Sequence, residues 1–169
     1  GVEGMLEPFE LDRLTPAATV GLSWSVRYND EDVLMLGAEY FYNSLGYERR
    51  EVYPWLMYQG DFQPFYTGRH YAGGYAVLMA PGSWNNTNFV LSTLGNLSDR
   101  SYVTRLDYSV LVLTHLQFEA FGAVHYGTEG GEFRFGLESP AMSVGDEELP
   151  AVSIPAPLFE AGIGLRINL

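Results

Sequence analysis

The segment 101–127, SYVTRLDYSVLVLTHLQFEAFGAVHYG, carries the clearest structural signal in this sequence. In each half, apolar or aromatic residues alternate with polar or small ones, and Thr114-His115 interrupts the alternation. Such a period of two is typical of a β-strand with one apolar face. The segment therefore predicts a long antiparallel hairpin with arms of about 11 residues, the length that a tilted strand needs to cross a bilayer.

The same alternation recurs outside this hairpin and predicts roughly eight strands in all, with no convincing helix. Short turn signals at residues 29–32 and 127–131 separate some of them. The other alternating runs begin at Thr19, Leu34, Tyr71, Asn88, Phe133 and Phe159.

Two segments are predicted to be long loops. Residues 44–69 mix aromatic side chains with Pro54, Pro64 and Gly60, and proline is tolerated only at strand starts and edges. We expect this segment to cap or plug a barrel, although stacking on sugar or lipid is an alternative. Residues 139–157 are rich in proline and contain the acidic run 146–148.

Composition excludes several classes of protein. The 169-residue chain has no cysteine, so it has neither a disulfide framework nor a thiolate metal site. No run of about 18 apolar residues occurs, which argues against a helical membrane protein. The net charge of −12 would repel a phosphate backbone, so nucleic acid is not expected as a partner. A signal peptide is either absent or was removed before Gly1.

Alternation alone does not say which face lies inside. In a soluble sandwich the apolar face forms the core, whereas in a membrane barrel it meets lipid and the polar face lines the lumen. Glycine and serine are frequent on the polar faces, as at Gly21, Ser23 and Gly164, and small residues suit a crowded interior better than an exposed strand surface. This favours the membrane barrel.

On this interpretation each face has its own set of functional residues. The charged and polar residues predicted to face the lumen are Arg27, Glu39, Arg105, Asp107, Glu119, His125, Arg134, Glu160 and Arg166. The aromatic residues predicted to form girdles at the membrane interfaces are Trp24, Tyr28, Tyr40, Tyr42, Tyr71, Tyr108, Phe118, Tyr126 and Phe159.

The repeated alternating hairpins and the ending FEAGIGLRINL (159–169) resemble the bacterial outer-membrane β-barrels, and in finer detail the closing portion of porin-like barrels. The resemblance covers about residues 19–169. It departs from that family at Leu169, where phenylalanine is usual. It implies an all-β, antiparallel up-and-down transmembrane barrel over residues 17–169, after a lead-in at 1–16. It also implies export through the periplasm to the Gram-negative outer membrane, with membrane lipid, the barrel-assembly machinery and other barrel chains as partners.

Counting strands raises a conflict with this family. In such barrels the long loops face outside and the last strand ends in the periplasm, but eight strands would place the two long loops on opposite sides. Either a strand is missing from the count, with residues 55–58 and 148–154 as candidates, or the loop rule fails. An odd number would indicate part of a larger or composite barrel.

We therefore expect a passive porin-like pore or a structural barrel without catalytic residues, metal or cofactor. The first alternative is a barrel enzyme acting on lipid, for which His70, His115 and His125 are the positions to examine and which requires His125 or His70 beside a serine or aspartate at the rim. The second is a soluble, secreted β-barrel or sandwich that binds a ligand.

Overall fold

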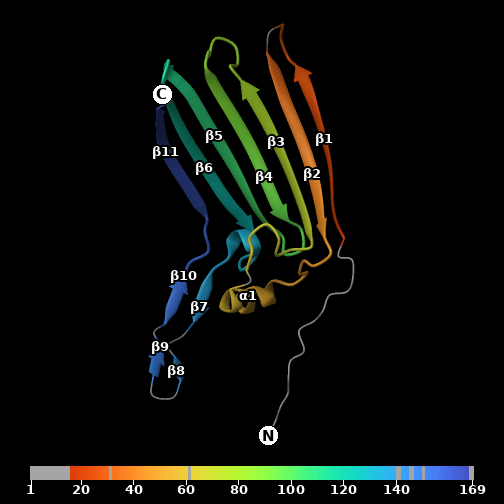
Figure 1. Cartoon of the computed structure of the whole chain (residues 1–169), viewed down its shortest axis with the longest axis vertical. Helices are drawn as coiled ribbons and strands as arrows, with labels where there is room; N and C mark the ends of the chain where they lie inside the picture. The colour runs from red at the N-terminus through yellow and green to blue at the C-terminus, as the bar shows by residue number, and fades with distance from the viewer. Residues whose placement is uncertain are drawn as a thin grey trace.

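The structure is a computed structural model that describes residues 16–30, 32–60, 62–139, 142–144, 147–149 and 151–167 (Figure 1). Its main feature is a seven-stranded sheet in which every strand is antiparallel to its neighbours. In sheet order the strands are β1 (Ala17–Arg27), β2 (Val33–Asn43), β3 (His70–Met79), β4 (Thr87–Asn96), β5 (Ser101–Leu113), β6 (Leu116–Gly127) and β11 (Phe159–Ile167). The predicted all-β, antiparallel up-and-down arrangement is confirmed.

The sheet is open. β1 and β11 form its two edges and do not pair with each other, so the described strands do not close into a barrel. The expectation of a closed barrel of about eight strands is not met. The predicted lead-in at residues 1–15 and the terminal Leu169 lie outside the described residues.

Residues 133–138 do not form the predicted eighth strand of the sheet. The first of them belong to a 3₁₀ turn, η2 (Glu132–Arg134), in which Glu132 and Phe133 are both buried. Beyond them β7 (Leu137–Ser139) pairs with β10 (Val152–Ile154), and β8 (Met142–Val144) pairs with β9 (Glu147–Leu149).

The aromatic segment 44–69 contains a short helix, so the prediction of no helix is wrong. A 3₁₀ turn, η1 (Arg50–Val52), leads into α1 (Tyr53–Gln59). Pro54 stands in the first turn, where its missing N–H is not needed, and Gly60 ends the helix with φ 79°. No helix in the described part of the chain has both the length and the apolar character to cross a membrane.

The two ends of the sheet differ. At the turn end, short connections at residues 28–32, 80–86 and 114–115 join consecutive strands. At the loop end lie residues 44–69, 97–100 and 128–158, and Figure 1 shows α1 and η2 gathered there. Both long connections therefore share one end, and β11 finishes at the other. An odd count of seven strands removes the conflict that arises with eight.

Candidate functional site: two sheet faces and a polar cluster

The apolar face of the sheet is bare even at its centre. Leu91, Leu106 and Val124, on β4, β5 and β6, are 46%, 47% and 50% exposed. An isolated exposed leucine is ordinary, but this face continues across all seven strands. Apolar area of this extent marks a surface that contacts another apolar phase or partner.

Aromatic rings form a band on this face near the turn end. Phe89 on β4 lies between Trp84 and Tyr108, with ring centroids 5.8 Å and 5.2 Å away, and Tyr108 lies 6.3 Å from Phe118. Trp24 on β1 lies toward the same end.

A second aromatic band crosses the apolar face near the loop end. Tyr102 stacks on Tyr126 at 5.4 Å, and the ring of His70 lies 5.4 Å from Tyr42 and accepts or donates a 2.6 Å hydrogen bond with the Tyr40 hydroxyl. Along β6, Phe118 and Tyr126 are separated by roughly 26 Å at 3.3 Å per residue. At the tilt of about 35–45° that barrel strands adopt, this separation corresponds to roughly 20 Å along the membrane normal, compared with about 25 Å for the apolar zone between the aromatic girdles of outer-membrane barrels.

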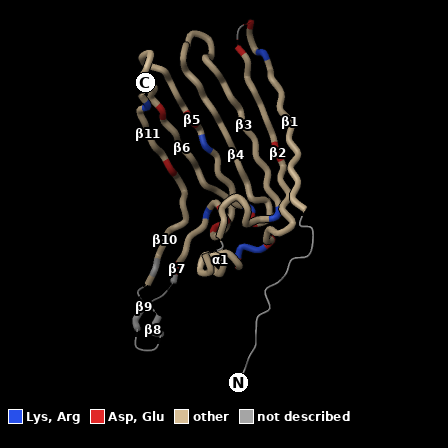
Figure 2. The backbone as a smooth tube through the Cα atoms, viewed as in Figure 1, with Lys and Arg blue, Asp and Glu red and all other residues tan. Residues whose placement is uncertain are grey.

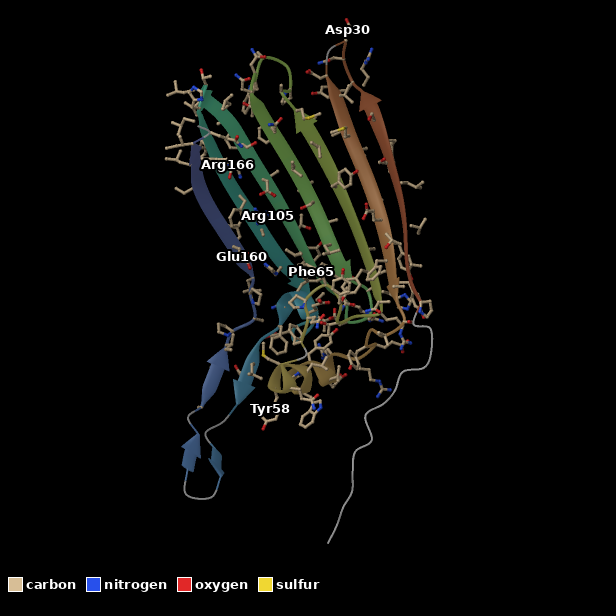
Figure 3. The ribbon with its side chains drawn as sticks, viewed as in Figure 1. Asp30, Tyr58, Phe65, Arg105, Glu160 and Arg166 are labelled. Atoms are coloured by element: carbon tan, nitrogen blue, oxygen red, sulfur yellow. The ribbon has the colours of Figure 1, made fainter. Side chains whose placement is uncertain are left out.

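The opposite, polar face carries ion pairs, one between β11 and β6 and one within β5. Arg166 Nη2 lies 3.1 Å from Glu119 Oε1, and Arg105 Nη2 lies 2.6 Å from Asp107 Oδ1. The Arg105 guanidinium also lies 3.9 Å from the centre of the Phe121 ring. Figure 2 shows that charged residues are sparse along the strands, and Figure 3 shows Arg105, Glu160 and Arg166 on β5 and β11. These predicted lumen charges largely neutralise one another.

A hollow of about 470 Å³ lies over β5, β6 and β11. Its lining is mixed, with the charges just described beside small residues that leave space. The lining residues are Arg105, Asp107, Tyr108, Ser109, Gln117, Glu119, Ala120, Phe121, Gly162, Ile163 and Gly164.

At the loop end, the polar face holds a cluster of buried polar side chains, which we call the end cluster: Tyr53, Tyr71, Asn96, Asp99, Ser101 and Glu132. Asp99 accepts hydrogen bonds through Oδ2 from the Tyr53 hydroxyl (2.7 Å), the Asn96 amide (3.1 Å) and the Glu132 N–H (2.7 Å). Through Oδ1 it accepts from the Ser101 N–H and hydroxyl, at 2.9 Å and 2.6 Å.

Glu132 is the second carboxylate of the end cluster. Its Oε2 accepts from the Tyr71 hydroxyl (2.6 Å) and the Asn96 amide (2.8 Å), and its Oε1 accepts from the Phe65 N–H. Every donor to these two carboxylates is neutral. Burial raises the pKa of Glu132 above the usual range, and burial together with the hydrogen bond to Asp99 raises the pKa of Tyr53.

The end cluster joins four parts of the chain. α1 contributes Tyr53, β3 contributes Tyr71, the β4–β5 corner contributes Asn96 and Asp99, and η2 contributes Glu132. Phe65 and Phe62 of segment 44–69 add ring contacts to Phe133 and Phe135, at 5.7 Å and 5.3 Å. Segments 44–69 and 130–135 therefore form a cap over one end of the polar face.

The histidines do not form a hydrolytic site. His125 Nδ1 lies 2.7 Å from the Phe133 carbonyl, and its Nε2 lies 3.1 Å from Glu160 Oε1. His70 contacts Tyr40 on the apolar face. In the described residues, the backbone N–H of His70 donates to Ser98 Oγ at 3.0 Å, but none of the three histidine rings hydrogen-bonds a serine hydroxyl or an aspartate. No group of three or more potential ligands in the described part of the chain is placed to hold a metal ion.

Two residues lie elsewhere than the sequence predicts. Tyr71 belongs to the polar face and is 3% exposed within the end cluster, so it is not a girdle residue. Arg134 lies in η2, not on a sheet strand, and its Nη1 donates to the Gly127 carbonyl. Glu39 and Arg27 lie on the polar face of β2 and β1, away from the paired charges.

The end cluster was not predicted from the sequence. Its members lie far apart along the chain, and only the corner 96–99, with an asparagine and an aspartate, has residues typical of a turn.

In comparisons with known proteins, no family model matches this sequence, and neither a curated protein nor a solved structure matches it significantly.

Proposed function

We propose that this chain is part of the wall of a bacterial outer-membrane β-barrel, with the apolar face toward lipid and the polar face toward the lumen. One observation carries the proposal: the cap packs against the loop end of the polar face and leaves the apolar face bare. A soluble sheet protein places its covering segments on the apolar face, because burial of apolar area is the main driving force of folding.

Two further features support this orientation. The aromatic bands lie at both ends of the apolar face, where amphipathic rings meet the headgroup level of a bilayer. The seven strands are 9 to 13 residues long, which matches the crossing length of tilted strands. With both long connections at one end, that end would face outside and the turn end would face the periplasm.

The role that we propose is passive. The charged side chains that line the hollow are engaged in ion pairs, Arg105 with Asp107 and Glu119 with Arg166. The wall would therefore serve as part of a pore for small solutes or as a structural element of the membrane, with lipid and the barrel-assembly machinery as its partners.

Two neighbouring positions on β4 test the orientation of the faces. Because the chain has no cysteine, Leu91→Cys and Ser92→Cys each introduce a single thiol, on the apolar and the polar face respectively. With the protein folded in lipid vesicles, a membrane-impermeant maleimide should label Ser92→Cys and leave Leu91→Cys unmodified. Faster labelling of Leu91→Cys, in a protein that stays in solution without detergent, would reverse the faces and refute the proposal.

A further inference from the structure

The two edge strands of the sheet are left with unpaired backbone groups. β1 pairs only with β2, and β11 pairs only with β6, so one row of N–H and C=O groups on each edge has no strand partner among the described residues. In hydrocarbon each such group costs several kcal/mol, so a wall of this kind has to be completed at both edges.

These edges also lack the features that prevent strand addition. Natural edge strands are protected by proline, bulges or charges on the side that would meet a neighbour. β1 and β11 contain no proline, and their pairing with β2 and β6 has no bulge. The charged residues of β11 are already engaged, Glu160 with His125 and Arg166 with Glu119.

The directions of the edge strands restrict what can complete the wall. Seven strands that alternate in direction place β1 and β11 parallel to each other, both running from the loop end to the turn end (Figure 1). Direct closure of β1 on β11 would therefore make a parallel pair. A second copy inserted in the same orientation would also present parallel edges, because rotation about the membrane normal does not reverse a strand.

We propose that an odd number of antiparallel strands fills the gap between β11 and β1, an inference that rests on the proposed function. These strands belong neither to residues 17–167 of this chain nor to the same residues of a second copy. Each strand bordering the gap runs from the turn end to the loop end. These strands are about 9 to 11 residues long, like β11 and β1, and have one apolar face.

Side-chain size on β1 adds a requirement for the strand beside it. The polar face of β1 has only small residues at its centre, Gly21, Ser23 and Ser25. Elsewhere on this face a large ring covers a small neighbour on the next strand: a Cβ added to Gly162 would lie 2.4 Å from the Phe121 ring, and one added to Gly37 would lie 2.3 Å from Tyr75. On β1 the Glu39 side chain of β2 already lies over Gly21, 2.9 Å from an added Cβ, so the space for large polar-face side chains of the next strand is beside Ser23 and Ser25.

Disulfide trapping distinguishes the possible neighbours of the edges. The double variant Leu22→Cys/Ile163→Cys places one thiol on the apolar side of each edge, and Leu22→Cys/Ala38→Cys, at register partners on β1 and β2, is the matched control for an adjacent pair. After oxidation in lipid vesicles, the control should form its disulfide and the edge pair should form none. A disulfide between Leu22→Cys and Ile163→Cys within one chain, or between two copies, would overturn the proposal.

A synthetic peptide with the sequence of β2, the known antiparallel neighbour of β1, tests the free edges directly. The peptide carries a nitroxide at one end or the other, and a second nitroxide is attached at Val26→Cys or Ile167→Cys, on the apolar face near the turn end of β1 and β11. The fixed label lies near one end of its strand. When the peptide binds antiparallel, one peptide end lies close to this label and the other end lies up to about 35 Å farther away. Parallel binding, or no binding, would overturn the proposal. If, in addition, the maleimide does not label Ser92→Cys in preference to Leu91→Cys, the proposed function itself is wrong.

Discussion

The Tyr71 hydroxyl donates a 2.6 Å hydrogen bond to Glu132 Oε2, which joins residues that are 61 positions apart in the sequence. Tyr71 belongs to the sheet and Glu132 to the cap, and both side chains are buried. This contact, together with those of Asp99, fixes the cap on the polar face, which is the arrangement on which the proposed orientation in the membrane depends.

Removing the Tyr71 hydroxyl should loosen the cap. Tyr71→Phe removes one donor to Glu132 and leaves the buried Gly68 N–H without its acceptor, and an unsatisfied buried polar group costs about 1–3 kcal/mol. We expect a lower free energy of unfolding in detergent and faster proteolysis within residues 44–69. Tyr75→Phe is the matched control, because the Tyr75 side chain lies on the same face of the same strand outside the end cluster. Equal effects of the two substitutions would contradict this role of Tyr71.

The stability of the cap should depend on pH through Glu132. Burial raises the pKa of this carboxyl, so the folded protein binds more protons than the unfolded chain between the usual glutamate pKa and the raised value. The free energy of unfolding should therefore fall as the pH rises through this window and be highest below it. In Glu132→Gln, urea unfolding at several pH values should show a smaller slope there. An unchanged slope would exclude Glu132 as the titrating group.

The ends of segment 44–69 meet closely at Gly46. A Cβ added there would lie 1.9 Å from the Gly68 carbonyl oxygen, a backbone atom that cannot turn aside. Gly46→Ala should therefore separate Gly46 from Gly68 and lower the free energy of unfolding by about 1–3 kcal/mol. Gly122→Ala is the control, because its Cβ would meet nothing closer than a ring atom of Phe159 at 3.9 Å. Chemical denaturation compares them, and equal stability of the two variants would contradict the close approach.

The contacts of His125 fix which ring nitrogen carries the hydrogen. Because a carbonyl only accepts, His125 Nδ1 donates to the Phe133 oxygen at 2.7 Å, and Nε2 is the ring nitrogen that faces Glu160 Oε1 at 3.1 Å. Nitrogen NMR of the labelled side chain should show a hydrogen on Nδ1 at every pH at which the protein is folded. In Glu160→Gln, an amide can donate to Nε2, so the same tautomer should persist. A hydrogen on Nε2 alone would contradict this geometry.

Strand pattern was readable from the sequence where the two faces of a strand differ. β5, β6 and β11 alternate cleanly between large apolar and charged or small residues, so their faces were predicted correctly. β3 is different: apart from His70, both of its faces are apolar or small, so the alternation does not say which side Tyr71 occupies. Its pairing with Phe41 and Asn96 settles the face, and pairing is not a local property.

The cap and the end cluster were beyond sequence patterns for a related reason. Glu132 and Phe133 match an alternating run, but tertiary burial of both residues overrides that preference. α1 is only seven residues long and is held by the contact of Tyr53 with Asp99. No local pattern in the sequence indicates that contact.

The orientation of the sheet in a bilayer is the central claim, and two tryptophans test it most directly. Trp24 lies on the apolar face of β1 and Trp55 on α1, and their exposed fractions are similar, 50% and 58%. Single-tryptophan variants (Trp55→Phe/Trp84→Phe and Trp24→Phe/Trp84→Phe) are folded into vesicles of phospholipid brominated on the acyl chains. Strong quenching of Trp24 fluorescence with little quenching of Trp55 is the predicted result. Equal quenching of both tryptophans, or none of Trp24, would contradict the membrane orientation.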